Sequence, residues 1–299
     1  MKRMLRELLR KLAGFPLSAK RKVKWIALTT ALLLAGWGIG MLLFFPASSL
    51  ENHLENEVAT QLRGNGSLDL EDLSLRLPLR LAARAATLRV KRLPATEIKA
   101  TDLEISPLWL SLLGGNPGLA YDFKLFGGNT EGFLRRNGEI HLKLENLQLA
   151  LPLREKSPLG IAGTIERGEL SAQWPPRANS ASRLNLTIND MRLTGLEAIG
   201  STSGELKLGS LVLQGAGMGN AFKIDRLESR DGQLTATGNG NLLLTNPIEH
   251  SRINLAVTLK PTPELDPQLL ELLGMFVKKD GAGNFPLHIS GTLSRPQAQ

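Results

Sequence analysis

The 299-residue chain contains no cysteine and one tyrosine, and aromatic residues make up only 5% of it. Without cysteine there is no disulfide framework and no thiolate for catalysis or metal binding. The chain also lacks a Walker A loop, and its four histidines are isolated in the sequence at positions 53, 141, 250 and 288. Metal-binding pairs of histidines need close, regular spacing. We therefore expect no metal site and no nucleotide-driven chemistry.

The sequence also shows no group of residues with the pattern of a catalytic site. Acidic residues alternate with apolar ones, as on the solvent side of an amphipathic sheet. The residue pattern brings together no nucleophile, base and orienting group, although only coordinates decide whether two carboxylates converge. The sequence therefore favours a protein that is not an enzyme and needs no cofactor.

Net charge is absent from most of the chain. The formal charge is +8, and residues 1–24 account for all of it, with nine Lys or Arg residues against Glu7 alone. The rest of the chain holds equal numbers of basic and acidic residues. A nucleic-acid surface needs clustered basic residues and stacking aromatics, so we expect no nucleic-acid partner.

The basic leader directly precedes an uncharged apolar run, residues 25–45. As a helix these 21 residues would be about 31 Å long, which matches the hydrocarbon core of a bilayer. Trp25 opens the run, and Phe44 and Phe45 close it, as interfacial aromatics do. Basic residues stay on the cytoplasmic side of a span, which predicts a single-pass anchor with residues 1–24 in the cytoplasm. The alternative is a signal peptide cleaved near Ala47, but its apolar region would be unusually long.

Two glycines within the run have the spacing of a helix-packing motif. Gly36 and Gly40 form a G-x-x-x-G, which lets two helix backbones approach closely in lipid. The alternative is that glycine is simply frequent in membrane helices. Association of this helix with another through Gly36 and Gly40 is therefore a hypothesis.

The spacing of apolar residues divides residues 46–299 into two parts. Residues 46–64 have apolar residues four apart and predict an amphipathic connecting helix. From residue 65 the period becomes two, as in the alternating leucines of 73–81 and in Ile253–Leu259, each of which predicts one strand. Gly-Asn and Asp-Gly turns separate such runs. We expect residues 65–299 to form a mainly β domain with an antiparallel sheet and a possible joint near 174–182.

The alternation slips by one residue at small polar positions in five similar segments. The polar residues at these slips are Asp72, Asp102, Asn146, Asp190 and Ser210. A strand that keeps its apolar side chains on one face accommodates such a slip with a β-bulge, and repeated bulges curve a sheet. The sequence predicts a long, curved, bulged sheet with an apolar concave face.

Two short helices are expected between the strands, one beginning at Pro107 and ending at Leu113, the other capped by Asp266 and reaching Val277. The apolar face is a candidate groove, and the alternative is that the same side chains pack against the second helix as a closed core. The candidate groove residues are Leu73, Leu75, Leu77, Leu142, Leu144, Leu186, Ile188, Leu206, Leu208, Ile253, Leu255 and Val257.

The C-terminal third carries glycine-marked β motifs. They are LESRDGQL at 227–234, GNG at 238–240, DGAGNFPL at 280–287 and ISGTLSRP at 289–296. With these motifs, and with YDFKLFGGNTEG at 121–132, the chain resembles the type II secretion system protein N family. The pattern of its strands is also similar to that of AsmA-like envelope proteins.

The first resemblance implies an accessory component of a type II secretion system, with no catalytic residues to carry over. It implies a bacterial inner-membrane protein with a periplasmic β domain that contacts other inner-membrane subunits and the secretin. The AsmA-like pattern implies an alternative, a groove that binds or transfers phospholipid.

Overall fold

The computed structural model of the chain describes residues 28–30, 32–33, 36, 40, 46–61, 66–76, 79–90, 97–153, 157–199, 201, 204–246 and 248–298. The chain divides into two compact units, Met1–Ala47 and Ser48–Gln299. The described residues before residue 46 are helical. The predicted leader and the aromatics Trp25, Phe44 and Phe45 lie outside the described residues. Within the described part of the chain, no helix combines the length and apolar character that crossing a membrane requires.

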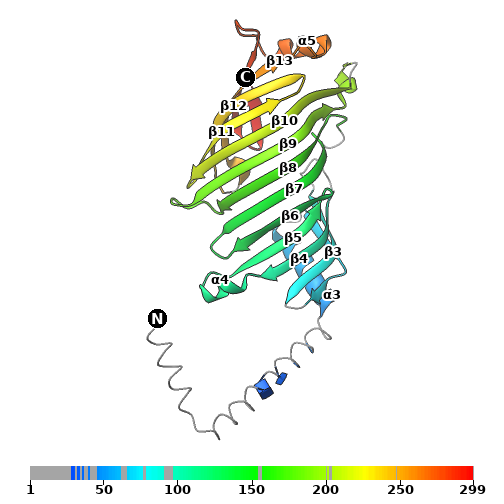
Figure 1. Cartoon of the computed structure of the whole chain (residues 1–299), viewed down its shortest axis with the longest axis vertical. Coiled ribbons are helices and arrows are strands. Elements are labelled where there is room, and N and C mark those ends of the chain that lie inside the picture. The colour runs from blue at the N-terminus through cyan, green and yellow to red at the C-terminus, as the bar shows by residue number, and fades with distance from the viewer. Residues whose placement is uncertain are drawn as a thin grey trace. The chain divides into compact units, whose positions relative to one another are not determined.

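The second unit is built on one antiparallel sheet of 15 strands (Figure 1). From β3 onward each strand pairs with the next one along the chain. The strands are β1 (Gly66–Glu71), β2 (Ser74–Arg76), β3 (Arg80–Val90), β4 (Glu97–Pro107), β5 (Gly118–Leu125), β6 (Gly128–Arg135), β7 (Glu139–Pro152), β8 (Gly160–Gln173), β9 (Ala181–Thr194), β10 (Glu205–Met218), β11 (Ala221–Arg230), β12 (Leu234–Leu243), β13 (Arg252–Pro261), β14 (Phe285–Thr292) and β15 (Arg295–Ala298).

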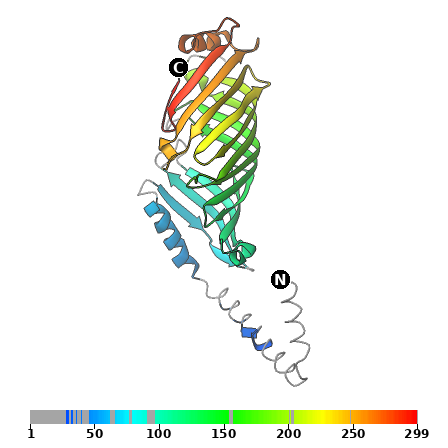
Figure 2. The same ribbon diagram turned by 90° about the vertical axis from the view of Figure 1, so that its left-hand side faces the viewer.

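The sheet is open and strongly curved (Figure 2). In Figure 1 the strands at both ends of the order turn behind the middle strands, so the viewer looks at the convex face. The predicted mainly β architecture, with a curved and bulged antiparallel sheet, is confirmed. Residues 174–180 form a loop between β8 and β9 of this sheet.

The helices of the second unit are short. They are α3 (Ala47–Gln61), α4 (Trp109–Leu113), α5 (Pro267–Phe276) and the 3-10 turns η1 (Leu196–Ile199) and η2 (Ile248–His250). The predicted cap of α5 is confirmed, because the Asp266 carboxylate accepts a 2.9 Å hydrogen bond from the Gln268 N–H and Pro267 opens the helix. The predicted start of α4 at Pro107 is wrong. Pro107 ends β4 opposite Leu119 of β5, and the helix begins at Trp109.

The prediction of one strand over residues 73–81 is also wrong. The described part of this segment is a tight hairpin, in which β2 pairs with the start of β3 and Leu75 lies opposite Leu81. Leu79, with φ 63°, lies in the turn between them. Two arms of a hairpin can share one alternating pattern, so periodicity alone does not separate them.

The predicted slips coincide with irregular backbone. Asp72, Asp102, Asn146 and Asp190 have φ between 51° and 58°, the left-handed region that Asp and Asn tolerate better than most residues. Near the fifth slip the left-handed residue is Gly209 (φ 71°) rather than Ser210. Glycine adopts this conformation without steric cost, so the irregularity moves by one residue. The register of β9 and β10 shifts on both sides of Gly209.

Glycines on neighbouring segments make room for these irregularities. A Cβ on Gly128 would lie 2.5 Å from the carbonyl carbon of Asn146, and one on Gly163 would lie 3.2 Å from Cα of Met191, beside Asp190. A Cβ on Gly232 would lie 2.5 Å from the carbonyl carbon of Leu208, beside Gly209. A side chain at Gly128 or Gly232 would overlap this backbone, whereas a Cβ at Gly163 would be only slightly too close.

The two edges of the sheet are protected differently. At the β1 edge, α3 supplies carboxylates that accept hydrogen bonds from backbone N–H groups: Glu55 from Leu70 of β1 at 3.0 Å, and Glu51 from Leu73, between β1 and β2, at 2.9 Å. At the other edge, β15 is only four residues long, is exposed and contains Pro296. Covering an edge, or shortening it and placing proline in it, prevents further strands from adding.

Candidate functional site

Pairing across the sheet places one row of apolar and glycine residues on a single face. Residues directly opposite in antiparallel strands share a face, and each pair in this row is directly opposite. We call this row the first lane; from β2 to β14 it consists of Leu75, Leu81, Ile105, Tyr121, Gly132, Leu142, Leu170, Leu184, Gly215, Ile224, Gly240, Leu255 and Ile289.

A second lane runs beside the first on the same face. From β5 to β14 it consists of Phe123, Thr130, Leu144, Gly168, Leu186, Leu213, Leu227, Gly238, Val257 and Leu287. Thr130 is its one side chain with a hydroxyl. The two lanes show that the register of the sheet, and not the individual strand alone, makes the apolar face continuous.

Large side chains of neighbouring strands lie over the glycines of the first lane. A Cβ on Gly132 would lie 2.6 Å from Oη of Tyr121, and one on Gly215 would lie 2.7 Å from the Phe222 ring. The Tyr121 hydroxyl also donates a 3.0 Å hydrogen bond to the His141 carbonyl. Burial raises the pKa of Tyr121 above its ordinary value, so this hydroxyl stays protonated and remains a donor.

The structure brings most of the predicted groove residues together on this face. Leu75, Leu142 and Leu255 lie in the first lane, and Leu144, Leu186 and Val257 lie in the second. Ile253 lies two residues before Leu255 on β13 and therefore points to the same side.

Ile188 lies two residues after Leu186 on β9 and therefore also points to this face. Ile188 is buried beside Leu147 and Ile165 in a cluster whose members all come from β5, β7, β8, β9 and β10. Leu73 is buried at the α3 edge, where its N–H is bonded to Glu51. Leu77 lies outside the described residues.

Helix α5 covers one end of the apolar face. Leu269 of α5 is buried with Leu206 of β10 and Leu234 of β12, and Leu208 packs against the same cluster. Leu206 and Leu208 therefore contribute to a closed core, as the alternative interpretation supposes for the whole face. The cluster around Ile188 is formed by strands.

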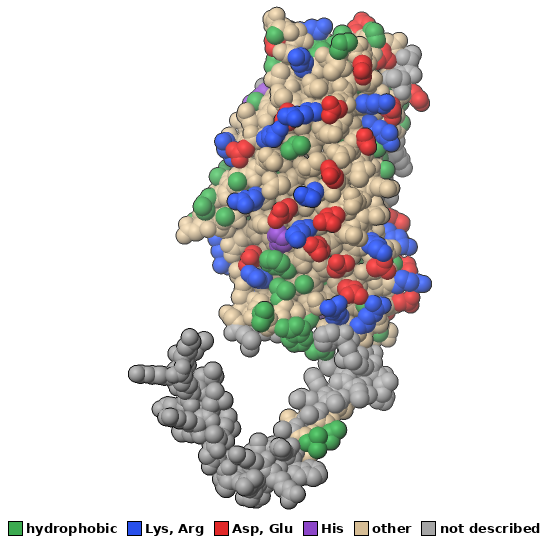
Figure 3. Space-filling view, in the orientation of Figure 1, with side chains coloured by type: hydrophobic (Ala, Val, Ile, Leu, Met, Phe, Trp, Pro, Cys, Tyr) green, Lys and Arg blue, Asp and Glu red, His purple; other side chains and the backbone are tan. Residues whose placement is uncertain are grey.

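The opposite, convex face is polar. Figure 3 shows basic and acidic side chains spread over the strands on this face. They are paired across strands, for example Lys143 with Glu131 at 3.1 Å and Arg135 with Glu139 at 2.7 Å. Exposed pairs of this kind contribute little to stability, but they keep the face soluble.

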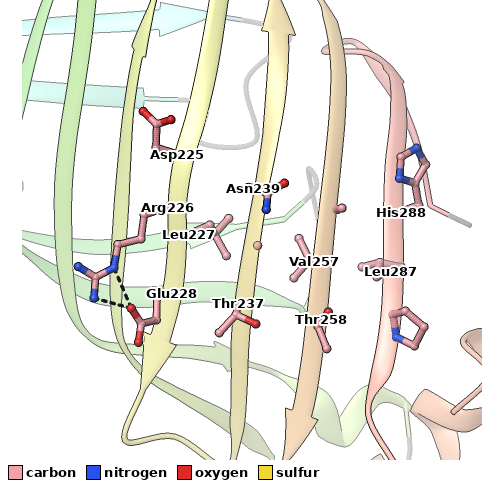
Figure 4. A pocket seen from close by; sticks show the side chains of 13 residues that line it. Asp225, Arg226, Leu227, Glu228, Thr237, Asn239, Val257, Thr258, Leu287 and His288 are labelled. Atoms are coloured by element: carbon pink, nitrogen blue, oxygen red, sulfur yellow. Dashed lines mark hydrogen bonds and ion pairs between the residues drawn. The ribbon is translucent and has the colours of Figure 1, made fainter. Parts of the chain in front are cut away.

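A shallow pocket of about 500 Å³ lies over β11–β14 (Figure 4). At one end of it Glu228 accepts hydrogen bonds from Arg226 at 2.8 Å and from Arg230 at 2.5 Å. Arg230 and then Arg226 lower the pKa of Glu228, so the carboxylate remains ionised at neutral pH. An ionised carboxylate held by two guanidinium groups is an acceptor in an ion-pair cluster and cannot serve as a general acid.

One group on the polar face has the residue types of a hydrolase. The His141 Nδ1 lies 2.9 Å from Oγ of Ser171, and its Nε2 lies 4.0 Å from Glu169. His141 and Ser171 are opposite each other in the β7–β8 ladder, so register explains the contact. The backbone there is engaged in pairing with β7 and β9, which leaves no preorganised oxyanion donors at Ser171. Among the described residues, no group of three or more His, Asp or Glu side chains could hold a metal ion.

Sequence reasoning missed a surface at one rim of the sheet. This rim is formed by the C-terminal ends of the even-numbered strands from β4 to β14 and by the segments that follow them. Large apolar side chains remain exposed along it: Trp109, Leu110, Leu119, Leu134, Met218, Leu243, Ile248 and Leu293. They are scattered in the sequence, so only the antiparallel order shows that they share a rim.

Comparison with known proteins identifies one relationship. A family model described as "Type II secretion system (T2SS), protein N" matches residues 84–288. The match begins in β3 and ends in β14, so it includes both lanes over most of their length and α5. No curated protein and no solved structure matches the chain.

Proposed function

The chain belongs to the type II secretion system protein N family, and from this we propose that it is a non-catalytic accessory component of a type II secretion machine, anchored in the bacterial inner membrane with its β domain in the periplasm. The family match over residues 84–288 carries the proposal.

The proposed topology is supported by the sequence. A leader with nine basic residues before an uncharged run of 21 residues favours a cytoplasmic N-terminus, a span at 25–45 and export of residues 46–299. Zero net charge on the exported part leaves the leader as the orienting signal.

We propose that partners in the membrane contact the chain at Gly36 and Gly40. Both are helical, and a Cβ added at either would meet no atom within 4 Å. Residues four apart lie on the same side of a helix, which is the side proposed to meet a second helix. We propose that other inner-membrane subunits of the secretion machine pack there, and that the periplasmic domain reaches toward the secretin.

Secretion by the host bacterium tests the proposal. Deleting the chain should retain substrates of the type II pathway in the periplasm, and the intact chain should restore their release. Gly36→Ile with Gly40→Ile should fail to restore it, whereas Leu33→Ile, an exposed position in the same segment, should succeed. Normal secretion by the deletion strain would contradict the accessory role, and a protease-resistant C-terminal domain in spheroplasts would contradict the topology.

A second candidate function is lipid binding along the apolar face. The observation that favours it is the continuity of the first lane over thirteen strands, with most of its side chains only partly buried. A curved apolar face of this length matches an acyl chain in chemistry. In this proposal α5 closes one end of the face, and the lanes beyond it accept phospholipid.

Neighbouring residues provide a matched test of lipid binding. A photo-crosslinking amino acid at Leu142 points to the apolar face, while one at Lys143 points to the polar face. In whole cells, crosslinks to phospholipid at residue 142 and not at 143 would support the lipid groove. Crosslinks at residue 142 to protein alone would contradict it and would favour packing of the lane against another subunit.

A further inference from the structure

Helix α4 presents apolar side chains to solvent. Leu110 is 85% exposed and Trp109 is 48% exposed. The helix is nevertheless held firmly, because the Leu108 N–H donates to the Gly118 carbonyl at 2.9 Å and the Ser111 N–H donates to the Leu108 carbonyl at 2.9 Å. The Ser111 hydroxyl donates to that carbonyl as well, at 2.5 Å. The exposure of Trp109 and Leu110 is thus a fixed feature of the fold.

The segment that leads into α4 is hydrogen-bonded to Gly118 of β5, directly before a further exposed leucine. Leu119 of β5 and Leu134 of β6 lie directly opposite each other, and each is about half exposed. We call Trp109, Leu110, Leu119 and Leu134 the α4 patch. Leu119 lies two residues before Tyr121 and Leu134 two residues after Gly132, so both lie on the face that carries the first lane, at its rim. Exposed apolar groups clustered in this way mark a contact surface on a soluble domain.

The position of the α4 patch identifies its occupant. In Figures 1 and 2, α4 and the beginning of α3 lie at the same end of the second unit. Helix α3 begins at Ala47, two residues after the end of the proposed membrane span. Only Pro46 separates the proposed span from α3, so this chain connection, at the end of the second unit that also carries the patch, is the argument for a bilayer as the occupant.

The chemistry of the patch fits a bilayer surface. Tryptophan favours the interface between headgroups and acyl chains, and leucine beside it enters the apolar layer. Arg135 and the exposed Arg136 follow Leu134 directly, and Arg135 is paired with Glu139 at 2.7 Å. A basic side chain next to such a patch favours anionic headgroups.

We propose that the α4 patch inserts into the interfacial layer of the same bilayer that anchors the chain, so that the domain rests on the membrane through a second point besides its span. This inference rests on the membrane anchoring proposed above. The second contact restricts rotation of the domain about its tether. It also fixes which end of the sheet faces the membrane.

The natural absence of cysteine makes the test direct. The full chain carrying Leu110→Cys, labelled with the environment-sensitive dye NBD, is reconstituted into phosphatidylethanolamine–phosphatidylglycerol vesicles with and without doxyl-labelled lipid. Met275→Cys on α5, where the native side chain is 70% exposed, is the control. NBD at residue 110 should emit at shorter wavelength than NBD at residue 275 and should lose intensity to doxyl lipid.

The outcomes separate the two proposals. Equal emission and equal quenching at residues 110 and 275, in a chain that resists carbonate extraction, would overturn the α4 contact and leave the anchor intact. Extraction by carbonate would overturn the anchor and the α4 contact with it. Shielding of residue 110 from aqueous iodide without quenching by doxyl lipid would indicate contact with a second copy and would overturn the bilayer contact.

Discussion

The Glu55 carboxylate accepts a 3.0 Å hydrogen bond from the backbone N–H of Leu70, and in doing so it ties helix α3 to the first strand of the sheet. Glu51, one helical turn earlier, does the same for Leu73 at 2.9 Å. Since β1 pairs with β3 along its other side, Glu55 occupies an N–H group on the free edge of β1, and Glu51 binds the segment that follows β1. The helix that joins the proposed anchor to the domain is therefore also the cover of its edge strand.

Replacing both carboxylates should expose that edge. We expect Glu51→Ala with Glu55→Ala to lower the free energy of unfolding by about 2 kcal/mol, because each lost hydrogen bond to a charged acceptor contributes on the order of 1 kcal/mol or more. Denaturant unfolding measures this loss, and gel filtration should show self-association through the uncovered strand. Asn52→Ala, at an exposed position of α3, is the control. A monomer of unchanged stability would show that α3 does not protect the edge.

The left-handed residue in β7 leads to a second prediction. Asn146 has φ 58°, which a residue with an ordinary side chain adopts at a cost of roughly 1 kcal/mol. Asn146→Ala should destabilise the domain by about that amount, whereas Asn146→Gly should be neutral. Asn254→Ala, in regular strand β13, serves as the control in the same thermal unfolding measurement. Equal losses for the alanine and glycine variants at position 146 would remove backbone strain as the explanation.

The bulges also show which features of the fold can be predicted from the sequence. A slip in alternation at Asp72, Asp102, Asn146 or Asp190 is a local signal with a local cause, so it could be found without coordinates. Ser210 was the wrong residue by one position, because an adjacent glycine competes for the same backbone conformation. The lanes were beyond prediction, since opposing residues such as Leu75 and Leu81 are defined by register between strands.

Glycine substitutions should have opposite effects at two places. A Cβ on Gly132 would lie 2.1 Å from the His141 carbonyl oxygen, so Gly132→Ala should cost about 2 kcal/mol or more by overpacking. A Cβ on Gly274 of α5 would meet no atom within 4 Å, so Gly274→Ala should stabilise by about 0.5–1 kcal/mol through helix propensity. Urea titration of both variants compares the two shifts. Tolerance of alanine at position 132 would mean that neither the His141 carbonyl nor Tyr121 lies against that glycine.

A buried hydroxyl in the second lane gives a prediction of increased stability. Thr130 is 1% exposed, and its Oγ1 has no hydrogen-bond partner among the described residues. Thr130→Val should therefore raise the free energy of unfolding by about 1 kcal/mol. Thr262→Val should lower it by a similar amount, because the Thr262 hydroxyl donates to the Gln233 carbonyl at 3.0 Å. A loss of stability in Thr130→Val would indicate that this hydroxyl is satisfied.

Acid should weaken the turn before β14. The Asn284 N–H, and then the Ala282 N–H, donate to the Asp280 carboxylate and lower its pKa from the ordinary 3.8. A carboxyl with a lowered folded-state pKa stabilises the fold above its unfolded pKa, and this contribution is lost as the pH falls through the folded value. Asp280→Asn should thus be less stable than the parent at pH 7, and the difference should be smaller at pH 3, which lies below the ordinary pKa of 3.8.

Urea midpoints at the two pH values test this relation. Glu271→Gln, on an exposed position of α5, provides a control for loss of a carboxylate outside a turn. A difference between the parent and Asp280→Asn that persists unchanged at the lower pH would assign the effect to packing.

Sequence periodicity located α5 and its cap, because Asp266 and Pro267 act within one turn of the helix. It misplaced the start of α4, since Pro107 is held in β4 by pairing with Leu119, a partner twelve residues away. The sequence did not predict the α4 patch for the same reason. Leu119 and Leu134 look like ordinary strand residues until their exposure at the rim is known.

The neighbour-to-neighbour order of the strands has a consequence for the size of the domain. From β3 onward each strand pairs only with its neighbours in the chain order. A hairpin could therefore be inserted or removed without changing the pairing of the other strands. Each such change would alter the extent of the sheet by about 10 Å, two strand spacings, and would leave its cross-section unchanged. During evolution, such a sheet can therefore be lengthened or shortened in steps of one hairpin. The number of hairpins sets its length.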